Sequence, residues 1–212
     1  GEDAICFCNE CGYVEEVNEA HTYKNGKCTV ANCDNACAHK TITDGVCEDC
    51  GGKYCGNTEN DKVVWFYDED TATLTFTGSG AMADYDNLDD MPWYNYQNNI
   101  TKVVIDNGVT TIGEFAFFNL QQLITVNLPD SLTTISGSAF AICRVLETVN
   151  LPANLETIEG WAFRQCHALE SATLPEGLTT VDMYAFAECI NLMSVSVPAS
   201  VTTIGEGAFV FC

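Results

Sequence analysis

The stretch LETVNLPANLETIEGWAFRQCHAL, residues 146–169, decides the fold because its pattern recurs every 23 residues along the second half of the chain. The recurring positions are a cysteine (Cys143, Cys166, Cys189, Cys212), an Ala-Phe pair (Phe117, Phe140, Phe163, Phe186, Phe209) and a proline (Pro129, Pro152, Pro175, Pro198). A period of about 20–50 residues indicates stacked units, each of which needs its neighbours to bury its apolar face. The sequence therefore predicts a solenoid with five copies of the repeat.

Each repeat can be divided into segments of expected secondary structure. In residues 146–152 the apolar residues alternate with Thr148 and Asn150, as in a strand with one buried face, and Pro152 ends the strand. Residues 155–158 form a second short extended piece. In residues 161–169 the apolar residues return at helical spacing and predict about two helical turns. We therefore expect an α/β repeat solenoid, a right-handed coil of short parallel strands and short helices.

The recurring cysteines are expected to be small buried hydrophobic residues, since Leu120 occupies the same position in the first repeat. Disulfides between adjacent coils are the alternative. A catalytic pair of Cys166 and His167 is excluded, because neighbouring residues on a helix point apart.

Residues 100–212 carry the pattern I-G-x-x-A-F-x-x-C-x-x-L-x-x-V-x-L-P-x-x-L-x-x-I. It resembles the BspA-like leucine-rich repeats of bacterial cell-surface proteins, and residues 63–105 resemble the hairpin segment that often precedes such arrays. The resemblance implies display on the surface of a host-associated or gut bacterium and a binding or adhesive role. It implies no catalytic residues.

The segment before the repeats is expected to cap them. VVWFYDED and TLTFTGSG, residues 63–70 and 73–80, are two alternating strand patterns around a turn, and a solenoid needs its apolar end covered. The nearby aspartates are interpreted as a solvated capping loop; a calcium site is the alternative, although the spacing lacks the glycine and glutamate of an EF-hand (Asp84, Asp86, Asp89, Asp90). We divide the chain into a head (1–55), a cap (56–101) and a solenoid (102–212).

The head is rich in cysteine and histidine and predicts two structural zinc ions. One site would use four residues in a short span (Cys37, His39, Cys47, Cys50), and the other would draw on five candidates from which the sequence does not choose four (Cys8, Cys11, His21, Cys28, Cys33). A disulfide framework is the alternative. Zinc is favoured because two histidines lie at matched positions and because the Cys-x-x-Cys pairs are poor disulfide partners for each other. The motif also resembles short zinc-binding Cys-His units that are repeated in secreted bacterial proteins.

Charge and hydropathy limit which partners the protein can bind and where in the cell it is expected. Eight basic and thirty acidic residues give a net charge of −22, a field that disfavours nucleic acid and anionic lipid. No apolar run approaches the roughly 20 residues of a membrane span. We find no signal peptide, and a start at Gly1 is as expected of a processed secreted protein. We therefore expect an extracellular or cell-surface protein that does not insert into a membrane.

The ligand is expected at one edge of the solenoid. The strands expose small polar residues, whereas the predicted helical edge carries the residue types that dominate binding hot spots (Phe115, Trp161, Arg164, His167, Tyr184). We predict that this edge binds a host protein or glycan; the alternative is that these side chains only shield neighbouring coils. A structural spacer is the second functional hypothesis, and a zinc enzyme is the least favoured. Apolar residues near the last coil predict further repeats or end-to-end association (Ile204, Phe209, Phe211).

Overall fold

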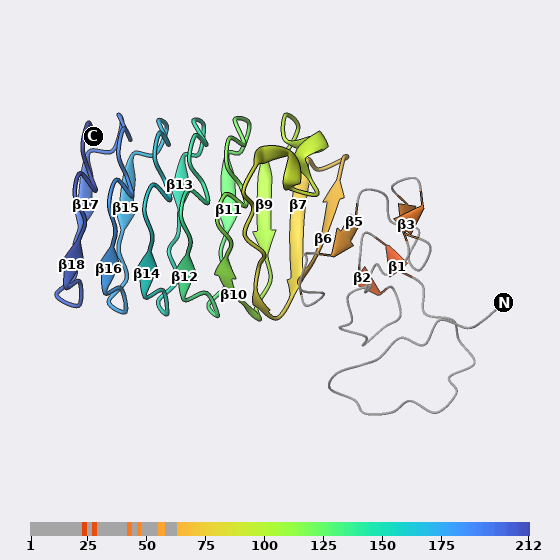
Figure 1. Cartoon of the computed structure of the whole chain (residues 1–212), viewed down its shortest axis with the longest axis horizontal. Helices are drawn as coiled ribbons and strands as arrows, with labels where there is room; N and C mark the ends of the chain where they lie inside the picture. The colour runs from red at the N-terminus through yellow and green to blue at the C-terminus, as the bar shows by residue number, and fades with distance from the viewer. Residues whose placement is uncertain (1–22, 25–26, 29–41, 44–45, 48–54, 58–62) are drawn as a thin grey trace, which may run out of the picture.

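The computed structural model describes residues 63–212 with their side chains (Figure 1). In residues 1–62 it describes the backbone of five short strands, β1 (Tyr23–Lys24), β2 (Lys27–Cys28), β3 (Ile42–Thr43), β4 (Val46–Cys47) and β5 (Cys55–Asn57). No helix in these described parts is long and apolar enough to cross a membrane.

Residues 102–212 form a β-solenoid with two strands per coil (Figure 1). The first row of strands is β9 (Lys102–Ile105), β11 (Thr125–Asn127), β13 (Thr148–Val149), β15 (Ser171–Thr173) and β17 (Ser194–Ser196). The second row is β10 (Val109–Ile112), β12 (Thr134–Ile135), β14 (Thr157–Ile158), β16 (Thr180–Val181) and β18 (Thr203–Ile204). All paired strands in these rows are parallel, and Thr125 lies beside Thr148 as Ile135 lies beside Ile158. The predicted 23-residue solenoid is confirmed.

The predicted short helices are wrong. Residues 161–169 form consecutive turns, and the only helices in residues 63–212 are two single 3₁₀ turns, η1 (Leu88–Asp90) and η2 (Tyr94–Tyr96). Trp161 and Gln165 have φ of 58° and 60°, a left-handed conformation that an α-helix of L-residues does not contain. The α/β description is therefore corrected to a β-solenoid.

Hydrogen bonds explain why this turn does not become a helix. Alternate N–H groups leave the turn for the next coil, with Phe163 donating to Ala185 O at 2.8 Å and Gln165 donating to Ala187 O at 2.9 Å. The N–H groups between them stay in the turn, as when Cys166 donates to Phe163 O at 3.2 Å. A helix would keep all of these bonds within one segment. Here the turn is also a hydrogen-bonded connection between coils.

The core is a column of stacked phenylalanine rings. Neighbouring rings lie 5.1–5.5 Å apart, with planes within 24° of each other (Phe117, Phe140, Phe163, Phe186, Phe209). Full burial of one such side chain contributes about 1.5–3 kcal/mol, so the column is a main source of cohesion between coils.

The recurring cysteines lie beside this column and are free thiols, as predicted for buried small residues. Cys143, Cys166 and Cys189 are buried, and their Sγ atoms lie 3.2–3.3 Å from carbonyl oxygens of the preceding coil. Burial raises the pKa of Cys143 and of Cys189 to about 12. These thiols therefore stay protonated and take part in packing, while Cys212 in the last coil is exposed.

The first coil of the solenoid begins before residue 102. Strands β6 (Val63–Asp68) and β7 (Thr73–Gly78) form an antiparallel hairpin. On its other side β7 pairs in parallel with β9, and β8 (Gly80–Ala81) pairs in parallel with β10. The residues from β7 onward therefore already follow the path of a coil, and β6 covers its outer edge, where β5 pairs with it.

Trp93 closes the apolar end of this first coil. Its side chain is fully buried and packs edge-on against Phe76 at 4.9 Å. Its indole Nε1 donates to the carbonyl oxygen of Ala116 at 3.0 Å. In later coils the equivalent carbonyl accepts a backbone N–H, as Ala139 O does from Phe117 at 2.8 Å. At the first coil, the indole N–H of Trp93 thus replaces the backbone N–H that a preceding coil would donate.

Two hairpins in the head have the same register. β1 pairs with β2 so that Tyr23 lies opposite Cys28, and β3 pairs with β4 so that Ile42 lies opposite Cys47. Their connecting residues are Asn-Gly and Asp-Gly in the sequence, the pairs most typical of two-residue hairpin loops. The two hairpins therefore agree with the matched spacing of cysteine and histidine in the two predicted zinc sites of the head.

Candidate functional site

The turns of successive coils place equivalent residues in rows along one edge of the solenoid, some exposed and some buried, such as Ala141 and Ala187. The first row holds residues at left-handed φ of 54–61° (Phe115, Ser138, Trp161, Tyr184, Gly207). The second row lies three residues further along each turn (Phe118, Ala141, Arg164, Ala187, Val210). Because the register repeats every 23 residues, side chains in a row are neighbours in space although they are distant in sequence.

Two aromatic contacts shape the edge. The rings of Trp161 and Tyr184 stack 5.9 Å apart with planes 12° from parallel, and Trp161 remains 39% exposed. Phe115 and Phe118 meet edge-on at 5.4 Å. Each pair leaves an aromatic surface available at the edge.

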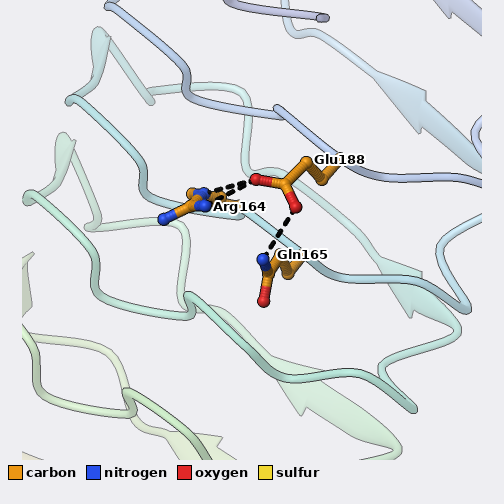
Figure 2. Close-up of polar contacts among 3 residues, drawn as sticks. All are labelled: Arg164, Gln165 and Glu188. Atoms are coloured by element: carbon orange, nitrogen blue, oxygen red, sulfur yellow. Dashed lines mark hydrogen bonds and ion pairs between the residues drawn. The ribbon is translucent and has the colours of Figure 1, made fainter. Parts of the chain in front are cut away.

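Arg164 is held by an acidic partner on the next coil (Figure 2). Its Nε and Nη2 atoms donate to Glu188 Oε1 at 2.8 and 2.6 Å, and Gln165 Nε2 donates to Glu188 Oε2 at 2.7 Å. The hydrogen bonds from Arg164 and Gln165 hold the pKa of Glu188 below its usual range. An exposed pair of this kind contributes at most about 1 kcal/mol, so its main effect is to fix the guanidinium in place.

Between these groups lies an open hollow of about 250 Å³. It is lined by three aromatic residues, one arginine and three smaller residues (Phe115, Phe118, Trp161, Arg164, Ser138, Ala141, Ile142). The hollow exists because Ser138 and Ala141 stand in the rows where Phe115 and Phe118 precede them and Trp161 and Arg164 follow.

The structure brings together only part of the predicted edge. Phe115, Trp161 and Arg164 line the hollow, and Tyr184 supports Trp161 from the far side. His167 does not line the hollow; it lies near Glu188 and contributes to the low pKa of that carboxyl group. Sequence reasoning missed Ser138, Ala141 and Ile142. Ser138 and Ala141 are small and carry no signal until the rows are aligned, and an aliphatic residue such as Ile142 is not distinctive in an apolar repeat.

Three carboxylates lie close to Gly137 and Glu114, the residues that precede Ser138 and Phe115 in the chain. Glu159 Oε2 accepts the Gly137 N–H at 3.0 Å, and Asp84 Oδ1 accepts the Glu114 N–H at 2.7 Å. Partial burial and the nearby charges of Asp84, Glu159 and Asp86 raise the pKa of Glu114. Within residues 63–212 no group of three or more His, Cys, Asp or Glu residues could hold a metal ion, so the described aspartates give no support to a calcium site.

The nine metal-ligand candidates of the head lie outside the residues whose side chains are described (Cys8, Cys11, His21, Cys28, Cys33, Cys37, His39, Cys47, Cys50). Their coordination therefore stays a prediction.

Comparisons with known proteins agree with the solenoid architecture. Two solved proteins with TM-scores of 0.53 are a leucine-rich repeat protein from Bacteroides ovatus and a leucine rich cell surface protein from Faecalibacterium prausnitzii. The first is 28% identical, with 71% of this chain and 44% of that chain covered; the second is 24% identical, with 76% and 53% covered. The chain thus spans about half the length of these proteins.

The comparison with curated proteins found no match. Residues 90–212, more than half of the chain, match the family described as BspA type Leucine rich repeat region, with six copies. The matched range begins at residue 90, ahead of the five repeats counted from the sequence. The chain belongs to the family of BspA-type leucine-rich repeat proteins.

Proposed function

We propose that this chain is the ligand-binding module of a secreted or cell-surface protein and that its aromatic edge contacts a host protein or glycan. The observation that carries the proposal is the hollow between Phe115 and Trp161, with Arg164 held beside it. Surface display is supported by the family and by the cell-surface description of the Faecalibacterium prausnitzii protein. We expect no catalytic activity, because repeat proteins of this family are understood as binding or structural modules.

The edge suits binding better than the exposed strand face does. The outward residues of the strands are small and polar, as at Thr148, Asn150 and Ser171, and they offer no anchor for a partner. Trp, Tyr and Arg are the residues most enriched in binding hot spots. A spacer would require neither the hollow nor the held arginine, which is why we place the spacer second.

The proposal is tested by a double variant of the edge. The chain is screened against immobilised extracellular-matrix proteins and an array of glycans, and affinities are measured for each hit. Trp161→Ala with Arg164→Ala should weaken binding by about tenfold to several hundredfold, the range of one or two hot-spot residues. The matched control is Thr148→Ala with Asn150→Ala on the strand face, which should bind normally.

Unchanged affinity in a folded edge variant, checked by circular dichroism, would contradict the proposed edge. A chain that binds nothing in either screen would favour the spacer.

For the head we propose two structural zinc ions, supported by the matched Cys and His spacings and by the two alike hairpins. Native mass spectrometry of the whole chain should find two zinc ions, and His39→Ala should lose one of them, while His167→Ala on the solenoid should keep both. Absence of zinc together with the mass loss of paired cysteines would show the disulfide framework instead.

A further inference from the structure

The hollow lies at the position between Phe115 and Trp161 in the first row, where Ser138 carries no ring. We propose that the slot over Ser138 and Ala141 binds one aromatic side chain presented by a basic segment of a partner protein. This inference rests on the proposed function, because it names the ligand of the same edge.

The spacing of the coils sets the width of the slot. Interior rings on adjacent coils lie 5.1–5.5 Å apart, and the exposed pair Trp161 and Tyr184 lies 5.9 Å apart. Phe115 and Trp161 are separated by two coils, and the intervening coil places Ser138 where a ring would otherwise stand. The hollow therefore has an aromatic residue on the coil to either side, Phe115 and Trp161, and no ring on the coil between them.

The volume and the lining favour an aromatic side chain. About 250 Å³ lies below the roughly 300–1,000 Å³ of pockets for drug-sized ligands, so the slot suits a single side chain. Most of the lining is hydrocarbon, and two N–H groups of Arg164 already serve Glu188. A sugar ring would need partners for several hydroxyl groups, whereas an aromatic ring can stack on the phenyl, indole and guanidinium surfaces.

The charge around the slot favours a basic partner. Gly137, the residue before Ser138, donates its N–H to Glu159, and a Cβ atom at Gly137 would lie 3.3 Å from Glu114 Oε1. Two carboxylates thus lie beside the residue that precedes Ser138, while the charge of Arg164 is balanced by Glu188. With a net charge of −22 over the chain, approach of lysine or arginine residues is favoured and approach of acidic segments is not.

Defined peptides test the inference on the whole chain. The probes are fluorescein-labelled Lys-Lys-Trp-Lys-Lys, the same peptide with alanine in place of tryptophan, and Glu-Glu-Trp-Glu-Glu, read by fluorescence anisotropy. The basic tryptophan peptide should bind at least tenfold more tightly than either of the others, because one side chain fills the slot and the flanking charges match its border.

Ser138→Phe should abolish this preference by filling the slot with the chain's own ring. The variant should fold, since Phe115, Trp161 and Tyr184 occupy the same row at φ of 54–58°. Asn150→Phe adds the same ring to the exposed strand face and should leave binding unchanged. Should Ser138→Phe fail to fold, Phe115→Ala removes one wall of the slot and should weaken binding of the tryptophan peptide at least tenfold.

Equal affinity for the tryptophan and alanine peptides would overturn the inference, as would full binding by folded Ser138→Phe. If a neutral oligosaccharide binds and the peptides do not, and if Ser138→Phe abolishes that binding, the aromatic ligand is the wrong class. The proposed binding edge would still stand. Failure of all probes together with failure of the matrix and glycan screens would remove both.

Discussion

The two ends of the solenoid are built from the same repeat but finish differently. At the first coil, Trp93 is buried and β6 pairs along the outer strand. At the last coil, Ile204 is 53% exposed and Phe211 is 75% exposed. A repeat stacks on either neighbour equally well, so only residues that depart from the repeat can close an end. At the first coil, residues that depart from the repeat cover the apolar face, whereas residues 204–211 follow the repeat and leave apolar side chains exposed.

The backbone hydrogen bonds of the first and the last coil differ in the same way. At the first coil the indole N–H of Trp93 donates to the carbonyl oxygen of Ala116, which would otherwise accept a backbone N–H from a preceding repeat. The N–H groups of Tyr184 and Phe186 donate to carbonyl oxygens of the following coil, whereas in residues 63–212 those of Gly207, Phe209 and Phe211 make no such bond. The first coil is thus covered by a side chain, whereas the backbone donors at residues 207–211 are the ones that a further repeat would pair.

Removing the closing ring should break this comparison most strongly. Trp93→Ala should lower the free energy of unfolding by about 3–5 kcal/mol, the usual cost of deleting a large buried aromatic side chain. Urea unfolding followed by circular dichroism measures the loss. Phe211→Ala at the other end is the matched control and should cost far less, since most of its ring is already in solvent. Equal losses at the two ends would show that Trp93 has no special closing role.

Keeping the ring while removing its hydrogen bond should have an intermediate effect. Trp93→Phe leaves the Ala116 carbonyl oxygen buried without the indole donor, and an unsatisfied buried acceptor costs about 1–3 kcal/mol. Chemical denaturation should place this variant between the wild type and Trp93→Ala. A variant as stable as the wild type would mean that the ring alone closes the end.

The ion pair between Arg164 and Glu188 tests whether surface contacts, and not only the interior, join the coils. Because its folded pKa is lowered, Glu188 contributes stability above its ordinary pKa of about 4.3, and that contribution is lost as pH falls through the lower folded value. The stability difference between wild type and Glu188→Gln should be at most about 1 kcal/mol at pH 7 and should shrink on acidification. A difference that grows at low pH would contradict this assignment.

The open end should respond least in stability but should change the assembly state. The prediction for the exposed apolar face at Ile204 and Phe211 stays twofold: further repeats cover it, or copies of this chain associate through it. Ile204→Glu with Phe211→Glu should alter the free energy of unfolding by no more than about 0.5 kcal/mol per exposed site, while sedimentation velocity should show loss of any concentration-dependent association. Association that persists in this variant would place the contact elsewhere.

Much of the solenoid follows from the sequence alone. The 23-residue spacing of the cysteines and phenylalanines predicts which residues stack, and the structure pairs Thr125 with Thr148 and Ile135 with Ile158 as expected. Repetition makes this possible, because equal spacing forces equal environments in every coil. In the predicted edge, Trp161 and Arg164 stand out in the sequence among small polar neighbours, and both line the hollow; that this edge binds a ligand stays a prediction.

Tertiary structure alone decided the turns and the slot. The apolar spacing in residues 161–169 fits a helix as well as it fits a turn with left-handed residues. Only stacking allows the N–H of Phe163 to prefer the next coil over its own segment. Likewise, the small side chains of Ser138 and Ala141 create a hollow only because the neighbouring coils place Phe115 and Trp161 on either side of them. The sequence determines what each coil contains, whereas contacts between coils decide which backbone bonds form and where a ring is missing.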